Sequence, residues 1–148
     1  MNFGDANQRI GDDHQHEVQM DHWWEMLGDI AQDLERLEGD LADLQKECQR
    51  LEKAGMYPAV PTESWEGRNG GETKYLRMIF PKSTPGVRRK EYIGCKRSAI
   101  AEARRLATNR QRWEELDRAK IQLERFLRII RNELARIAER AAYYRVRE

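Results

Sequence analysis

Two long stretches of the chain carry apolar residues at alternating spacings of three and four positions. In the first stretch these positions are Met20, Trp23, Leu27, Ile30, Leu34, Leu37, Leu41, Leu44, Cys48 and Leu51. In the second, with Lys120 as one polar exception, they are Trp113, Leu116, Lys120, Leu123, Leu127, Ile130, Leu134, Ile137, Ala141 and Tyr144. A mean spacing of about 3.5 residues is typical of helices that supercoil around a partner. The pattern predicts two coiled-coil helices, over residues 17–54 and 98–148.

The segment 55–97 between the two helices has a different pattern. Residues 73–80 alternate in polarity, which predicts a strand with Tyr75, Arg77 and Ile79 on one face and the intervening residues on the other. Aromatic and branched residues are enriched here, as they are in strands. We therefore expect a small β insert between the helices.

Two further segments can pair with this strand. Residues 87–93 predict a second strand, which Gly94 ends, and residues 64–66 are a candidate third strand. A lone hairpin is marginal in water, so a third strand or contact with the helices is needed. The insert is expected to be a two- or three-stranded antiparallel sheet.

Helix-capping and helix-terminating residues set the expected boundaries of the helices. Gly55 is placed to end the first helix, and Ser98 is a plausible N-cap for the second. Residues 1–16 lack periodicity and are expected to form a flexible tail. The predicted fold is mainly α: an antiparallel coiled-coil hairpin with the β insert at its tip. In that register Leu51 faces the start of the second helix.

The end of the longer second helix would then overhang with its apolar stripe uncovered. A second chain is a better cover than the polar N-terminal tail, so a homo-oligomer is expected. The pairing could also be intermolecular throughout, which the sequence leaves open. The residues predicted to take part in oligomerisation are Trp24, Leu134, Ile137, Ala141 and Tyr144.

Charge is distributed unevenly along the chain. Residues 1–66 hold 16 acids and 5 bases, and residues 67–148 hold 10 acids and 22 bases. Such a division indicates that the halves attract each other or that the basic half has an anionic partner. Acids on one helix can pair with bases on the other across the coiled coil. The bases of the insert have no such partner.

The insert is therefore the candidate nucleic-acid surface, because lysines and arginines bind phosphates and a two-stranded ribbon fits a major groove. The predicted contact residues are Lys74, Tyr75, Arg77, Lys82, Arg88, Arg89, Lys90, Tyr92, Lys96 and Arg97. A solvated basic edge that resists aggregation is the alternative interpretation. DNA is favoured over RNA as the partner.

No catalytic motif, glycine-rich phosphate loop or paired cysteine motif occurs, and we expect no enzymatic activity and no cofactor. The histidines near the N-terminus do not match the ligand spacing of zinc sites, so no metal is predicted. Lys120, alone among apolar positions, fits a role in fixing helix register. Two cysteines without an export or membrane segment indicate free thiols and a cytoplasmic protein.

Three short motifs carry a resemblance to a known family. They are the Lys74–Arg77 stretch, the run Gly86–Gly94 that ends in Tyr-Ile-Gly, and the Ala-Ile-x-x-Ala opening at Ala99–Ala103. Together, residues 65–103 resemble the three-stranded arm-type DNA-binding modules of phage tyrosine recombinases. The resemblance implies a DNA-contacting tip and a mobile-element context, although no recombinase catalytic domain follows.

The helix–β–helix layout is also similar, by analogy of architecture alone, to prefoldin subunits. Two rival functions therefore stand beside DNA binding. One is a structural or chaperone-like oligomer. The other is an adaptor or inhibitor that binds another protein, with the acidic first helix imitating DNA.

Overall fold

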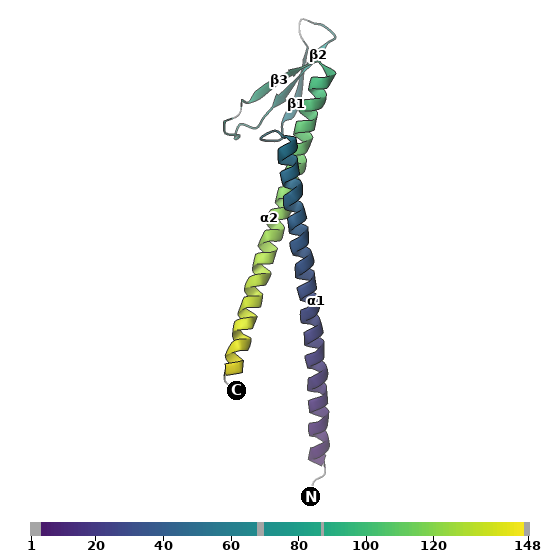
Figure 1. The fold of residues 1–148 in the computed structure, drawn as a ribbon. Helices are drawn as coiled ribbons and strands as arrows, with labels where there is room; N and C mark the ends of the chain where they lie inside the picture. The colour runs from purple at the N-terminus through teal and green to yellow at the C-terminus, as the bar shows by residue number, and fades with distance from the viewer. Residues whose placement is uncertain (1–3, 68–69, 87, 147–148) are drawn as a thin grey trace. The chain divides into compact units, whose positions relative to one another are not determined.

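The protein consists of two long helices separated in the sequence by a small antiparallel sheet (Figure 1). The computed structural model describes residues 4–67, 70–86 and 88–146. The elements in chain order are α1 (Gly4–Ala54), β1 (Thr62–Gly67), β2 (Lys74–Ile79), β3 (Lys90–Gly94) and α2 (Arg97–Val146). The prediction of a mainly helical fold with a small antiparallel sheet is confirmed.

The C-terminal boundary of α1 agrees with the prediction. Gly55 has a φ of 96°, a left-handed conformation that favours glycine, and its N–H donates to the Leu51 carbonyl at 3.1 Å. The N-terminal boundary differs, because α1 begins at Gly4 rather than near Glu17. No proline interrupts the chain before Pro58, so nothing in this stretch forces a break.

The predicted start of the second helix differs by one residue from the observed one, and parts of both predicted end segments are not described. α2 begins at Arg97, so Ser98 lies inside its first turn and is not the N-cap. Residues 1–3 of the predicted tail and residues 147–148 of the second helix lie outside the described residues. The side chains of Met20 and Trp23, which begin the first heptad pattern, also lie outside them.

The chain divides into two compact units, residues 1–40 and residues 41–148. In the first unit α1 is continuous up to Asp40, and its described side chains are exposed apart from Leu34 and Leu37, which are half-buried. The second unit contains the end of α1, the whole sheet and α2. All the packing described below belongs to this second unit.

The sheet is a three-stranded meander in the order β1-β2-β3, with both strand pairs antiparallel. Trp65 of β1 lies opposite Leu76, and Tyr92 of β3 lies opposite Arg77. A bulge interrupts the second pairing between Leu76 and Arg77. The predicted third strand is therefore present, and it is longer than the residues 64–66 that the sequence indicated.

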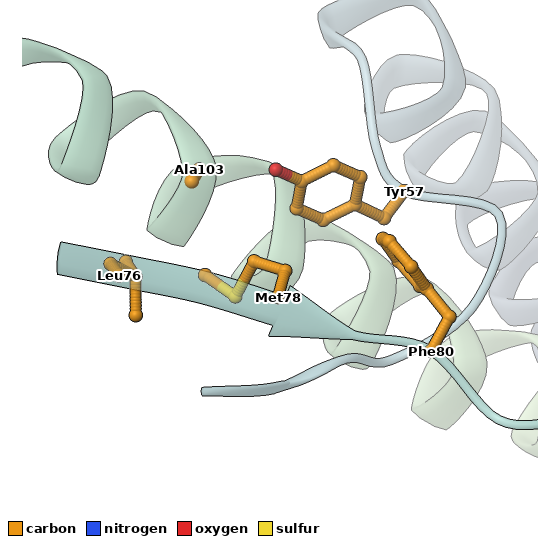
Figure 2. Packing of buried hydrophobic residues seen from close by; sticks show 5 residues of the cluster. All are labelled: Tyr57, Leu76, Met78, Phe80 and Ala103. Carbon is orange, nitrogen blue, oxygen red and sulfur yellow. The ribbon is translucent and has the colours of Figure 1, made fainter. Parts of the chain in front are cut away.

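One face of the sheet packs on the first turns of α2 (Figure 2). Leu76 and Met78 of β2, with Phe80 beyond its end, form a buried cluster with Ala103 of α2 and with Tyr57. The Tyr57 and Phe80 rings meet edge to face, with centroids 5.2 Å apart. This cluster is the main apolar core of the second unit.

The prediction that the sheet stands at a hairpin tip is wrong. The sheet lies between the helices in the sequence and against the side of α2, where Ile100, Leu106 and Ala107 extend the cluster. The physical reason is that the alternating apolar residues of β2 give this small sheet one face that must be covered.

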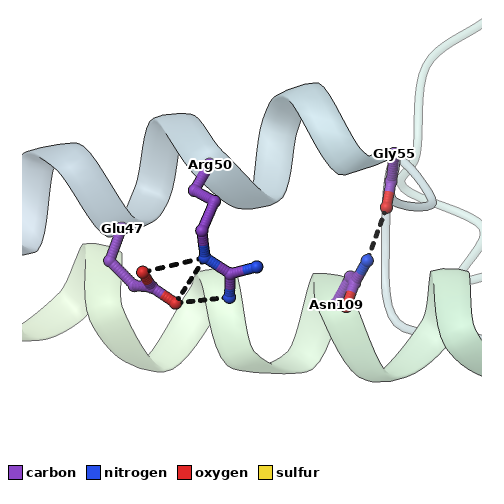
Figure 3. Close-up of polar contacts among 4 residues, drawn as sticks. All are labelled: Glu47, Arg50, Gly55 and Asn109. Carbon is purple, nitrogen blue, oxygen red and sulfur yellow. Dashed lines mark hydrogen bonds and ion pairs between the residues drawn. The ribbon is translucent and has the colours of Figure 1, made fainter.

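The last turns of α1, from Leu41 to Ala54, run antiparallel beside the middle of α2. Cys48 and Leu51 are buried with Leu116, and the Trp113 indole Nε1 donates to Glu52 at 3.1 Å. Figure 3 shows Asn109 donating through Nδ2 to the Gly55 carbonyl at 2.9 Å. Leu51 thus lies beside Leu116 and not beside the start of α2, because the sheet occupies the first turns of that helix.

Lys120 lies where the two helices meet, at the single polar position of the second heptad pattern. Its ammonium is 3.3 Å from the Asp117 carboxylate, and both side chains are largely covered. Burial raises the pKa of the neighbouring Cys48 thiol, and the Lys120 charge opposes that increase. The position is consistent with a lysine that fixes register.

Candidate nucleic-acid interface

The face of the sheet that points away from α2 carries polar and aromatic side chains. Successive residues of a strand point to opposite faces, so Tyr75, Arg77 and Ile79 lie opposite the buried residues of β2. β3 adds Lys90 and Tyr92, which pair with Ile79 and Arg77 respectively. We call these five residues the outer face. The alternation of β2 is confirmed as the sequence predicted it.

Two tyrosines stack on each other in the outer face. The rings of Tyr75 and Tyr92 are 6.2 Å apart between centroids, with an angle of 26° between their planes. Arg77 lies beside them, opposite Tyr92, and forms an ion pair with Glu66 of β1. Tyr92 is exposed and Tyr75 half-buried, and accessible aromatic rings next to a guanidinium group are a surface on which nucleobases can stack.

The other predicted cations are all exposed, and their side chains form no ion pair with any residue that the structure describes. They are Lys74, Lys82, Arg88, Arg89, Lys90, Lys96 and Arg97. Seven exposed cations without an ion-pair partner among the described residues leave the surface of this small sheet strongly basic.

The strand register places these cations in two groups at opposite ends of the sheet. β2 and β3 are antiparallel, so the residues that follow β2 lie near those that precede β3. Lys82 and the run Arg88–Lys90 therefore belong to one end, which we call the cationic end. Lys74, Lys96 and Arg97 belong to the other end.

An open groove of about 520 Å³ lies beside the cationic end. Its lining residues are Tyr57, Pro58, Phe80, Gly86, Arg88, Lys90, Glu91 and Tyr92. Burial raises the pKa of Tyr57 to about 12, and the Glu91 carboxylate beside it adds to the increase. The Tyr57 hydroxyl consequently stays protonated at neutral pH. The groove combines an apolar floor with a basic rim.

Sequence reasoning missed two arginines of α2, one of which attaches this helix to β1 and the other to the end of α1. Arg104 of α2 binds Glu63 of β1 through two hydrogen bonds, of 2.8 and 3.2 Å, and its guanidinium lies 6.0 Å from the Trp65 ring. The bond from Arg104 lowers the pKa of Glu63. Arg105 donates to the Ala54 carbonyl at 2.9 Å. Only the strand register, which puts Glu63 opposite the buried Met78, could have indicated the first contact.

The predicted oligomerisation residues are mostly exposed. Trp24, Ile137, Ala141 and Tyr144 are exposed, while Leu134 is half-buried. Phe126 and Ile129 of α2 are exposed as well. Neither residue lies at a heptad position, so the periodic pattern of the sequence did not indicate them. Self-association through this surface stays a prediction.

The structure adds nothing that indicates a metal or membrane site in the part of the chain it describes. No group of three or more His, Cys, Asp or Glu residues there could hold a metal ion. None of the helices, within the same residues, has a segment long and apolar enough to cross a membrane. Comparison of the chain with protein-family profiles, curated proteins and solved structures found no match.

Proposed function

We propose that this chain is a non-enzymatic nucleic-acid-binding protein, with DNA as the favoured partner. The observation that supports this best is the outer face, where stacked tyrosines lie beside Arg77 and next to cations that form no ion pair within the described part of the chain. The opposite face of the sheet is already covered by α2. Of the two faces, the outer face is the one available to a polyanion.

The chemistry of the outer face fits contacts of two kinds. The exposed cations would bind backbone phosphates, which gives affinity without sequence information and makes binding strongly dependent on salt. The tyrosine pair would contact a sugar or a base. A three-stranded sheet that presents one face is also consistent with the resemblance to arm-type DNA-binding modules, which implies phage or mobile-element context.

The helices would act as the scaffold and the assembly element. We propose that the antiparallel pairing between residues 41–55 and α2 belongs to a coiled-coil hairpin, and that the helices also carry self-association. Alternating apolar positions on both helices support a coiled coil. In this arrangement the binding sheet is held on a rigid helical rod.

The test is a comparison of two triple-alanine variants that remove the same charge. The first replaces Arg88, Arg89 and Lys90, and the control replaces exposed cations of α1 at Arg36, Lys46 and Lys53. Fluorescence anisotropy with a labelled duplex is measured from 50 to 300 mM salt. We expect roughly tenfold weaker binding and a salt slope lower by about 2 to 3 for the first variant, with much smaller changes for the control.

Two outcomes would contradict the proposal. Equal losses in both variants would assign the affinity to overall charge and not to the cationic end. No binding by the unmodified chain at low salt, to duplex DNA, single-stranded DNA or RNA, would reject nucleic acid as the partner. A large assembly with no response to nucleic acid would favour the structural-oligomer alternative instead.

A further inference from the structure

The C-terminal half of α2 has an apolar face wider than its contact with α1 requires. Leu116 and Leu127 are buried in the second unit. On the same helix Phe126 is 50 % exposed, Ile129 61 %, Ile137 58 % and Tyr144 67 %. An exposed apolar strip of this kind marks a surface that another element covers.

Helix geometry shows that these residues form one strip. At about 100° per residue, Ile137 and Tyr144 lie within about 20° of Phe126 around the helix axis. Ile129 lies about 60° to one side and Leu127 about 100° to the other. The apolar residues therefore span about 160° of the helix surface, an arc that also contains Glu133 and Arg140 and exceeds the contact that one neighbouring helix fills. Within the second unit, the end of α1 meets this strip at Leu41, near Leu127, so the rest of the strip has room for another helix.

Charge decides what kind of helix can occupy this strip. Residues 118–145 of α2 contain eight bases and three acids. A second α2 would bring like charges together, which is unfavourable at the flanks of a helix pair. The strip therefore calls for an acidic amphipathic helix.

The described part of α1 before Leu41 has this chemistry. Residues 24–40 contain six acids and one base, and their apolar positions Trp24, Leu27 and Ile30 are exposed. The lengths match as well: at 1.5 Å per residue, these 17 residues extend about 25 Å, and residues 126–144 about 28 Å.

We propose that two copies of this chain associate, with residues 24–40 of one copy packed on the Phe126–Tyr144 strip of the other. The contact is reciprocal, so each copy supplies one acidic and one basic helix and the assembly closes as a two-fold dimer. This inference rests on the self-association part of the proposed function. It does not depend on nucleic-acid binding.

The decisive test uses two charge-reversal variants of the full chain. One is Asp33→Lys with Asp40→Lys on the acidic helix, and the other is Arg136→Glu with Arg140→Glu on the basic helix. Light scattering after size exclusion, without nucleic acid, measures the mass. We expect the unmodified chain at twice its 17.5 kDa and each variant at 17.5 kDa. An equimolar mixture of the two variants should return to the dimer mass.

The mixture distinguishes contact between chains from contact within a chain. In a mixed dimer both helix pairs again join opposite charges. If the two helices instead paired within one chain, mixing the variants would restore no contact and the mass would not change. A mixture that remains at 17.5 kDa would therefore overturn the proposal, as would an unmodified chain that is monomeric at 100 µM. A dimer unaffected by either variant would overturn these surfaces while leaving self-association intact.

A second pair of variants tests the apolar strip itself. Phe126→Ser with Ile129→Ser removes exposed apolar groups, so the monomer should fold normally and the dimer should dissociate at least about tenfold more readily. Ile121→Ser is the matched control, because Ile121 is also exposed but lies about 140° away from Phe126. Equal weakening by both variants would contradict the assignment of the strip.

Discussion

Replacing Met78 by alanine tests how the sheet is held on α2. Met78 is completely buried in the cluster that joins β2 to α2. Truncation of a buried methionine to alanine costs about 2 to 5 kcal/mol, because apolar contacts are lost and a cavity remains. We take about 3 kcal/mol as the expected loss. At about 1.4 kcal/mol for each factor of ten, this is a decrease of roughly a hundredfold in the equilibrium that keeps the sheet folded.

The loss should be local. A three-stranded sheet with a one-sided core has little stability of its own, so a penalty of this size opens the sheet before the helices separate. The cluster formed by Cys48, Leu51 and Leu116 does not involve the sheet and should stay intact. Hydrogen–deuterium exchange with mass spectrometry can follow both regions in one experiment.

The control is the neighbouring residue on the outer face. Ile79→Ala removes a similar number of atoms from a half-buried position that does not face α2. We expect protection of the β2 amides to fall roughly a hundredfold for Met78→Ala and much less for Ile79→Ala. Equal effects of the two substitutions would refute the one-sided core. Loss of protection in residues 41–54 as well would refute the independence of the helix contact.

Three further predictions concern the helix junction and the thiols. Gly55→Ala should destabilise the protein by about 1 to 2 kcal/mol in urea unfolding, since φ is 96° there and the new Cβ would lie 3.3 Å from Leu106 Cδ2; an unchanged midpoint would contradict this conformation. Asn109→Ala should cost about 1 kcal/mol by removing the donor to the Gly55 carbonyl, and the same unfolding assay would show no change if that bond does not form. Cys95 is exposed while burial raises the pKa of Cys48, so a thiol reagent at pH 8 should modify Cys95 first and Cys48 only on unfolding or at higher pH. Peptide mass mapping measures the labelling of each thiol, and equal labelling of both at early times would contradict the burial of Cys48.

The strand β2 was predictable from the sequence because only one of its two faces is buried, so apolar and polar residues alternate along it. The residues of β2 alternate between the covered and the outer face, so the period of two in the sequence reports directly on packing. The end of α1 at Gly55 was predictable because helices commonly end at a residue with a left-handed backbone conformation, which glycine adopts most readily.

The register between the helices was not predictable in the same way. A heptad pattern permits a partner to slide by whole repeats with little change in apolar burial. What fixes the register here is the position of Asn109 beside Gly55 and of Leu116 beside Leu51, and both depend on the sheet occupying the first turns of α2. Contacts between distant segments, such as Arg104 with Glu63, follow from that placement and leave no periodic signal in the sequence.

The basic residues of the second unit fall into two classes with different physical roles. Arg77, Arg104 and Arg105 each bind an acid, and the last two connect α2 to β1 and to the end of α1. Cations of the run Arg88–Lys90 have no such contact among the described residues. Under the proposed function, replacing Arg104 would weaken nucleic-acid binding even without a direct contact, because the sheet would lose one attachment. The salt slope separates the two causes: an altered sheet position changes the affinity, whereas removal of phosphate contacts also lowers the number of counterions released.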